Sequence, residues 1–257
     1  TKTIILAATI NTAGYISAMQ VSNIYLLTIL QFFIGFGTAA SFGPLIADTS
    51  HWFLKRRGIA VALIASGNYF SGAIWPPIFN STLQSDGWRD VYGILAMATI
   101  FIMIPLSFLL TKKITEETSR ISDAASENKR ASVNISPRML TILLSVAGIG
   151  CCVAMSMPQV HIVAFCIDLG FGPAVGAEML SLMLIGGIIS RLINGLIADK
   201  LGGVYTLLIG STLQCIALFL YLPFDGLVSL YIVSAVFGLS QGGIVPSYAI
   251  IIREYLP

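Results

Sequence analysis

The chain alternates between long uncharged runs and short polar segments. Eight runs of about twenty residues or more are dominated by apolar side chains and contain a single charge between them. About 20 residues of α-helix cross the roughly 30 Å hydrocarbon core of a bilayer. The pattern therefore predicts eight membrane-spanning helices, at 3–21, 24–47, 58–85, 91–111, 139–167, 179–198, 201–224 and 226–252.

Composition agrees with this pattern and excludes a water-soluble fold. Of the 257 residues, 56% are hydrophobic and 10% are charged, whereas about 25% of residues are charged in soluble domains. The longest polar segment, 112–138, is rich in charge and serine and is expected to be a flexible linker. It separates an expected first bundle of four helices, 1–111, from a second, 139–257.

The basic residues are distributed unevenly between the two sides of the predicted bundle. When successive loops are assigned alternately, twelve Lys and Arg residues fall on the side of the 112–138 linker and only Arg89 falls on the other. Cytoplasmic loops carry the excess of Lys and Arg. The linker is therefore expected to be cytoplasmic, in a multi-pass protein of the plasma membrane.

The two halves share a weak pattern of helix-breaking residues. Pro44 precedes Phe53 by nine residues in the second run, and Pro246 precedes Tyr255 by nine in the eighth. Gly and Pro at matching places in two halves indicate a transporter built from duplicated bundles. The alternative is that Gly and Pro are simply frequent in membrane helices.

Arg191 is the one charge inside an apolar run. It precedes Asp199 by eight residues, which at about 1.5 Å per residue places it roughly 12 Å from the end of its helix. A cation at that depth costs from about 2.5 to more than 10 kcal/mol unless it faces a partner or a cavity. A guanidinium matches a carboxylate bidentately, so we expect Arg191 to bind an anionic substrate. The alternative is an acid on a helix outside this chain.

Three further polar residues are candidates for the substrate route. Asn68 and Asn194 could line the cavity or could hydrogen-bond between helices. His161, near one end of the fifth run, could titrate or contact substrate, or could be an ordinary packing residue. Asp48 near the end of the second run, with Arg56 and Arg57 just after it, is expected to take part in gating.

Two motifs resemble those of a known family. Gly195-Leu196-Ile197-Ala198-Asp199-Lys200-Leu201-Gly202 resembles the cytoplasmic-loop signature of the major facilitator superfamily, between helices eight and nine. The segment from Trp52 to Ala60, followed by Ala65-Ser66-Gly67, is similar to the fifth-helix entry of monocarboxylate transporters and oxalate/formate antiporters. The resemblance covers the entire chain and implies helices three to ten of twelve, truncated at both ends.

The resemblance carries expectations for fold and site. It implies a major facilitator fold of two pseudo-symmetric bundles, with Arg191 at the substrate-binding position of helix eight. It also implies that Gly195, Asp199, Lys200 and Gly202 form an inner-gate loop. Proton-coupled members have an Asp where this chain has Gly187, so proton coupling by that route is not expected.

Together these observations predict a secondary active transporter that moves small organic anions, monocarboxylates or dicarboxylates, by alternating access. Its partners are the substrate anion, the lipid bilayer and either a proton or a counter-anion, with no nucleic acid, cofactor or metal. No nucleophile–base pair is found, so an enzyme is not expected. The alternatives are an exporter of neutral or cationic small molecules and a non-transporting receptor on the same scaffold.

Overall fold

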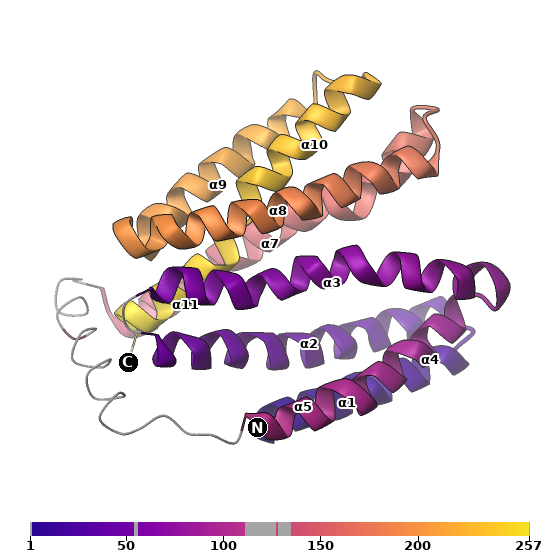
Figure 1. The fold of residues 1–257 in the computed structure, drawn as a ribbon, viewed down its shortest axis with the longest axis horizontal. Helices are drawn as coiled ribbons and strands as arrows, with labels where there is room; N and C mark the ends of the chain where they lie inside the picture. Colours follow the sequence, from indigo (N-terminus) through magenta and orange to yellow (C-terminus); the bar gives the residue numbers. More distant parts are fainter. Residues whose placement is uncertain (1, 54–55, 111–126, 128–134, 257) are drawn as a thin grey trace. The chain divides into compact units, whose positions relative to one another are not determined.

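The structure, a computed structural model, describes residues 2–53, 56–110, 127 and 135–256. All regular secondary structure in these ranges is helical (Figure 1), which confirms the predicted all-α class. Most of the expected linker at 112–138 lies outside the described residues.

In the described part of its first half, the chain forms four long helical segments. Three are continuous α-helices, and the fourth is interrupted by one π-helical stretch, η1. Their bounds are α1 Lys2–Gln20, α2 Ile24–Trp52, α3 Arg57–Ser85, α4 Trp88–Ala98, η1 Thr99–Met103 and α5 Ile104–Leu109. Pro44 lies inside α2 without ending it.

Residues 135–256 form five α-helices from four predicted runs. The first begins at Pro137, two residues before the predicted run, because the Ser136 side chain accepts a hydrogen bond from the Met139 amide and caps it. The last predicted run is split in two. The bounds are α7 Pro137–Asp168, α8 Pro173–Leu201, α9 Gly203–Leu220, α10 Leu227–Gln241 and α11 Ile244–Tyr255.

Length and apolar composition qualify seven segments of the described chain to cross a membrane, with α10 and α11 together forming one of them. The predicted first span, α1, is not among the seven. It is 19 residues long, but Asn11 and several Thr and Ser residues lower its hydropathy. All eight predicted runs are thus confirmed as helical, the last one in two pieces, and seven of these segments also qualify as membrane spans.

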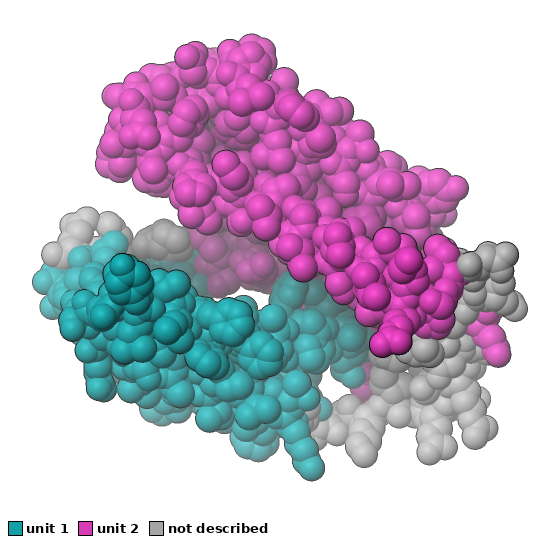
Figure 2. Space-filling model, turned by 180° about the vertical axis from the view of Figure 1, so that it is seen from behind, with its two compact units in different colours: residues 1–48, 74–116 teal, residues 49–73, 117–257 magenta. Residues whose placement is uncertain are grey.

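The helices group into two compact units, coloured separately in Figure 2. Unit 1 comprises 1–48 and 74–116, and in it α1 packs against α4. Unit 2 comprises 49–73 and 117–257, and in it α8 packs against α7, α9 and α10. The first part of α3 thus belongs with the later helices, while the proposed duplication into bundles 1–111 and 139–257 stays a prediction.

Glycines allow α8 and α10 to approach closely. A Cβ at Gly238 would lie 2.8 Å from the Cα of Met183, and one at Gly186 would lie 3.3 Å from the Cα of Gly238. Small residues at such crossings are what allow membrane helices to gain van der Waals contact between their backbones. This close approach brings the middle of α8 against the end of α10.

Candidate functional site

The Arg191 side chain is buried in unit 2, with 1% of its surface exposed. Its Nε donates a hydrogen bond to the carbonyl oxygen of Gly242 at 3.0 Å, and its Nη1 donates to the carbonyl oxygen of Ala65. The guanidinium carbon lies 4.1 Å from the centroid of the Tyr69 ring. Among the described residues, the groups that contact this cation are carbonyls and an aromatic ring, and none is a carboxylate.

The break between α10 and α11 explains why Gly242 can accept this hydrogen bond. In a continuous helix the carbonyl of residue 242 would bond to the amide of residue 246. Residue 246 is proline, which has no N–H. The helix is interrupted at Gly242 and Gly243. The Arg191 Nε–H takes the place of the missing donor.

Gly187 makes room for the aromatic partner of Arg191. It lies one helical turn before Arg191, and a Cβ at this position would approach the Tyr69 ring to 2.8 Å. Tyr69 is buried, and its hydroxyl donates a hydrogen bond to the sulfur of Met155 at 3.6 Å. The space that an Asp side chain would need at position 187 is therefore filled by the ring that stacks on Arg191.

Two glutamines lie beside this group. The Gln159 Nε2 of α7 donates to the Gln241 Oε1 of α10 at 2.9 Å. Gln241 is fully buried and directly precedes Gly242. Neither glutamine was a candidate from the sequence, although two amides in otherwise apolar runs are a signal that could have identified them.

Asn194 lies next to the helix break. A Cβ on Gly243 would overlap the Asn194 side chain, so α11 begins directly against this residue. The Asn194 Nδ2 donates to the Ser190 carbonyl oxygen at 2.8 Å and lies 3.1 Å from the Ser190 hydroxyl. Asn194 is thus placed near Arg191, with its amide hydrogens directed along its own helix.

The other two candidates, His161 and Asn68, are not among the contacts of Arg191. His161 is exposed and lines an apolar cavity of about 300 Å³ between α7 and the end of α9, together with Met157, Phe165 and Tyr221. Asn68 is exposed on α3, beside Tyr69. Their roles in substrate binding stay predictions.

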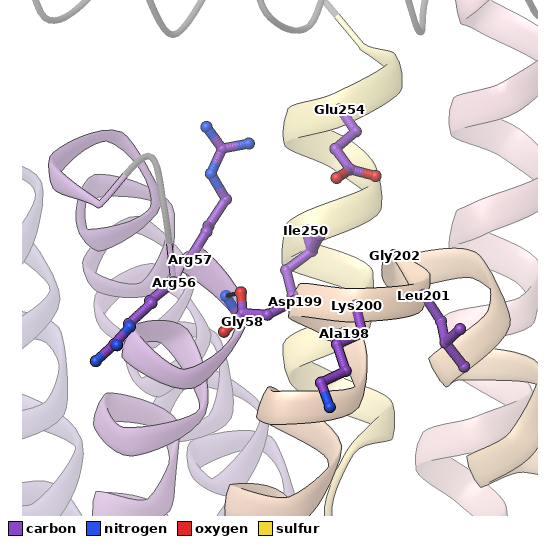
Figure 3. Close-up of a pocket in the computed structure, with 10 residues that line it drawn as sticks. All are labelled: Arg56, Arg57, Gly58, Ala198, Asp199, Lys200, Leu201, Gly202, Ile250 and Glu254. Carbon is purple, nitrogen blue, oxygen red and sulfur yellow. Dashed lines mark hydrogen bonds between the residues drawn. The ribbon is translucent and has the colours of Figure 1, made fainter.

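The end of α8 contacts the start of α3 through Asp199. Its Oδ1 accepts a hydrogen bond from the Gly58 amide at 2.6 Å, and its Oδ2 accepts one from the Ile59 amide at 3.1 Å. Figure 3 shows the carboxylate directed at this helix start. The first amides of a helix have no partner within the helix and carry partial positive charge, so the carboxylate satisfies two of them.

Close packing of two glycines allows this contact. A Cβ at Gly195 would lie 2.7 Å from the Cβ of Ala62, and one at Gly58 would overlap the Gly195 carbonyl oxygen. Gly202, at the end of α8, has a φ of 86°, a left-handed conformation that favours glycine. The three glycines thus place Asp199 within reach of α3 and turn the chain into α9.

The remaining gate candidates line a polar cavity at the same end of α8. The volume of this cavity is about 490 Å³, and its lining includes Arg56, Arg57 and Lys200 together with Ile250 and Glu254 of α11 (Figure 3). Asp48 lies in unit 1, exposed and one turn before the end of α2. The structure therefore gathers Arg56, Arg57, Gly195, Asp199, Lys200 and Gly202 around one contact, and their gating role stays a prediction.

Replacing Asp199 by Asn should loosen the first turn of α3. The amide side chain has one acceptor oxygen and no charge, and a carboxylate at an exposed helix N-terminus contributes about 1 kcal/mol. In the full-length protein, hydrogen exchange of the peptide containing Gly58 and Ile59 should speed up by about fivefold. Asp225→Asn, in the exposed loop before α10, should leave it unchanged, and equal exchange in both variants would refute the capping role.

The fold and this site together define a multi-pass helical membrane protein with a broken helix opposite a buried arginine. The sequence matches the Major Facilitator Superfamily model over residues 1–257. The chain belongs to the Major Facilitator Superfamily, a family of transporters, and is not an enzyme.

The sequence identity to individual relatives is low. The chain is 24% identical over 222 residues to monocarboxylate transporter 13 of Rattus norvegicus, covering 86% of this chain and 51% of the relative. It is 28% identical over 211 residues to an MFS-type transporter of Gibberella moniliformis, covering 80% of this chain and 48% of the relative. It is 25% identical over 228 residues to the agnestins efflux protein AgnL12 of Paecilomyces divaricatus, covering 86% of this chain and 50% of the relative. The chain spans about half the length of these curated relatives.

Proposed function

We propose that the protein containing this chain is a secondary active transporter of small organic anions, monocarboxylates or dicarboxylates, and that Arg191 binds the substrate carboxylate. The observation that carries the proposal is a buried guanidinium whose described neighbours are two carbonyls and one ring. Neutral dipoles reduce the cost of burying the cation but leave its charge uncompensated. An anion entering this region would therefore be attracted strongly, because the surroundings are poor in water.

The geometry leaves donors for such an anion. A guanidinium has five N–H groups, and the two hydrogen bonds to protein carbonyls use one on Nε and one on Nη1. The Gly242 bond fixes the orientation of the side chain. A carboxylate could then replace the Ala65 carbonyl and bind to Nη1 and Nη2 when α3 moves away from α8.

Alternating access supplies a reason for that movement. The contact between α3 and α8 contains both the Ala65–Arg191 bond and the Asp199 cap on Gly58 and Ile59. In the proposed cycle this contact is closed at the inner gate, with Arg56 and Lys200 around it, and opens as one bundle rocks against the other. Asp48 is proposed to take part in the same gating. The proposed orientation has the 112–138 linker in the cytoplasm and the protein in the plasma membrane.

Gly187 bears on the coupled ion. The position that holds an Asp in similar proton-coupled carriers is occupied by glycine and by the Tyr69 ring. The proposed cycle therefore uses no proton carrier at that point, and exchange against a counter-anion is the simpler coupling. The monocarboxylate transporter among the relatives is consistent with an acid as cargo.

A second candidate is an exporter of neutral or cationic small molecules, in which Arg191 is purely structural. The low exposure of Arg191 favours this reading, and one relative is named as an efflux protein. In that case the arginine would simply join α3, α8 and the broken helix through its two carbonyl bonds.

Uptake by the full-length protein in proteoliposomes distinguishes the two candidates. Labelled lactate, pyruvate, formate and oxalate should be accumulated above protein-free vesicles, and unlabelled acid inside should speed up uptake more than a pH gradient does. Transport of none of the four acids by folded protein would favour the exporter. If uptake is accelerated only by the pH gradient, the proposal of an anionic substrate would stand, but counter-anion exchange would be rejected.

A further inference from the structure

We infer that Gln159 and Gln241 form a second recognition point beside Arg191, which selects carboxylates that carry another acceptor oxygen near the carboxyl group. The inference rests on the proposed anion transport and adds two specificity-determining residues to it. Its starting point is a buried donor without an acceptor.

That donor is the Nε2 of Gln241. It is fully buried and has no hydrogen-bond partner among the described residues. The Oε1 of the same amide accepts from the Gln159 Nε2 at 2.9 Å, so the amide is held in place while its N–H groups stay unmatched. Buried polar groups in folded proteins are nearly always hydrogen-bonded, and exceptions often mark functional sites.

The position of this donor connects it to the arginine. Gln241 is followed by Gly242, whose carbonyl oxygen accepts from the Arg191 Nε. The Tyr69 ring stacks on the guanidinium of Arg191. These contacts place the guanidinium of Arg191 against Gly242, the residue that directly follows the unmatched amide of Gln241.

The Arg191 guanidinium and the Gln241 amide both offer hydrogen-bond donors, so together they suit a ligand with two sets of acceptors. A carboxylate would bind the guanidinium, and an oxo or hydroxyl oxygen on the neighbouring carbon would accept from the Gln241 Nε2. An acid without that oxygen would leave the amide unmatched in the bound state, and sites built to hydrogen-bond a substrate oxygen reject analogues that lack it.

Equilibrium binding to the full-length protein in nanodiscs tests the inference, with pyruvate and propionate as probes because they differ by one oxo group. The wild type should bind pyruvate about tenfold more tightly than propionate. In Gln241→Leu the two affinities should become equal, with that for propionate changed by less than about threefold. Gln159→Leu should reduce the preference as well, because it releases the amide of Gln241.

Gln214→Leu is the matched control. Gln214 is also a buried glutamine of unit 2 with an unmatched amide atom, but it lies on α9 and donates to the Cys151 carbonyl oxygen at 3.5 Å. Its variant should keep the tenfold preference. A preference that survives in folded Gln241→Leu, or that is lost equally in Gln214→Leu, would overturn the inference and leave the role of Arg191 intact. Failure of the wild type to bind either acid would overturn both proposals.

Discussion

Gly242→Ala should destabilise the protein strongly. The added Cβ would lie 2.6 Å from the Arg191 backbone nitrogen, 2.8 Å from the Ser190 Cβ and still closer to the Gly187 carbonyl oxygen. Two of these atoms belong to the backbone of α8 and cannot rotate away. Overpacking a tight interior costs about 1–3 kcal/mol and occasionally more, and we expect at least the upper end of that range.

The loss is measured as the thermal midpoint of the full-length protein in detergent, followed by size-exclusion chromatography. A decrease of about 3 kcal/mol corresponds to about 6–12 °C for a domain of this size. Gly148→Ala on α7 is the control, because no atom outside its own helix lies within 4 Å of the added Cβ. It should be neutral or stabilising by up to about 1 kcal/mol. Equal midpoints for the two variants would contradict the close contact between α8 and the broken helix.

Arg191→Lys should remove most of the carboxylate affinity while keeping the positive charge. An ammonium is a point charge with a single nitrogen, so it cannot hold the Gly242 carbonyl and two carboxylate oxygens in the fork geometry of a guanidinium. Loss of one charge-assisted hydrogen bond costs about 1.5–3 kcal/mol. This predicts a decrease of about 10- to 150-fold in kcat/KM for uptake of the preferred acid.

The matched control is Arg89→Lys. Arg89 is exposed, donates to the Val21 carbonyl oxygen at 3.1 Å and stacks on Trp88, so it reproduces the same substitution outside the site. Uptake of the preferred acid by Arg89→Lys should stay within about twofold of the wild-type value. Wild-type uptake by folded Arg191→Lys would reject Arg191 as the carboxylate anchor and favour its purely structural role.

Much of the fold could be predicted from hydropathy because a bilayer forces the backbone into helices of nearly fixed length. The division of the last run could not be predicted by that criterion, since residues 227–252 contain no charged side chain. The signal was instead local: Pro246 removes the donor for the Gly242 carbonyl, and two adjacent glycines lie at that point. Hydropathy does not select α1 as a span, because its polar residues are spread among apolar neighbours.

The place of Arg191 along its helix could be predicted from the sequence, whereas its surroundings could not. That place follows from counting residues to Asp199, which lies on the same helix. The Ala65 carbonyl lies 126 residues away along the chain, and one sequence does not show which helices meet. The same limit applies to Asp199, whose partners are the amides of Gly58 and Ile59 in another helix and not its own turn.

The most direct test of the carboxylate anchor measures the distance between the guanidinium and a bound acid. Full-length protein labelled with ¹⁵N on the arginine side chains, in lipid, would be loaded with an acid labelled with ¹³C at its carboxyl carbon for solid-state NMR dipolar recoupling. We predict recoupling that corresponds to about 4 Å, the separation set by a bidentate pair, and its disappearance in Arg191→Lys. A bound acid with no recoupling in the wild type, or with recoupling that persists in Arg191→Lys, would contradict the assignment of Arg191 as the anchor.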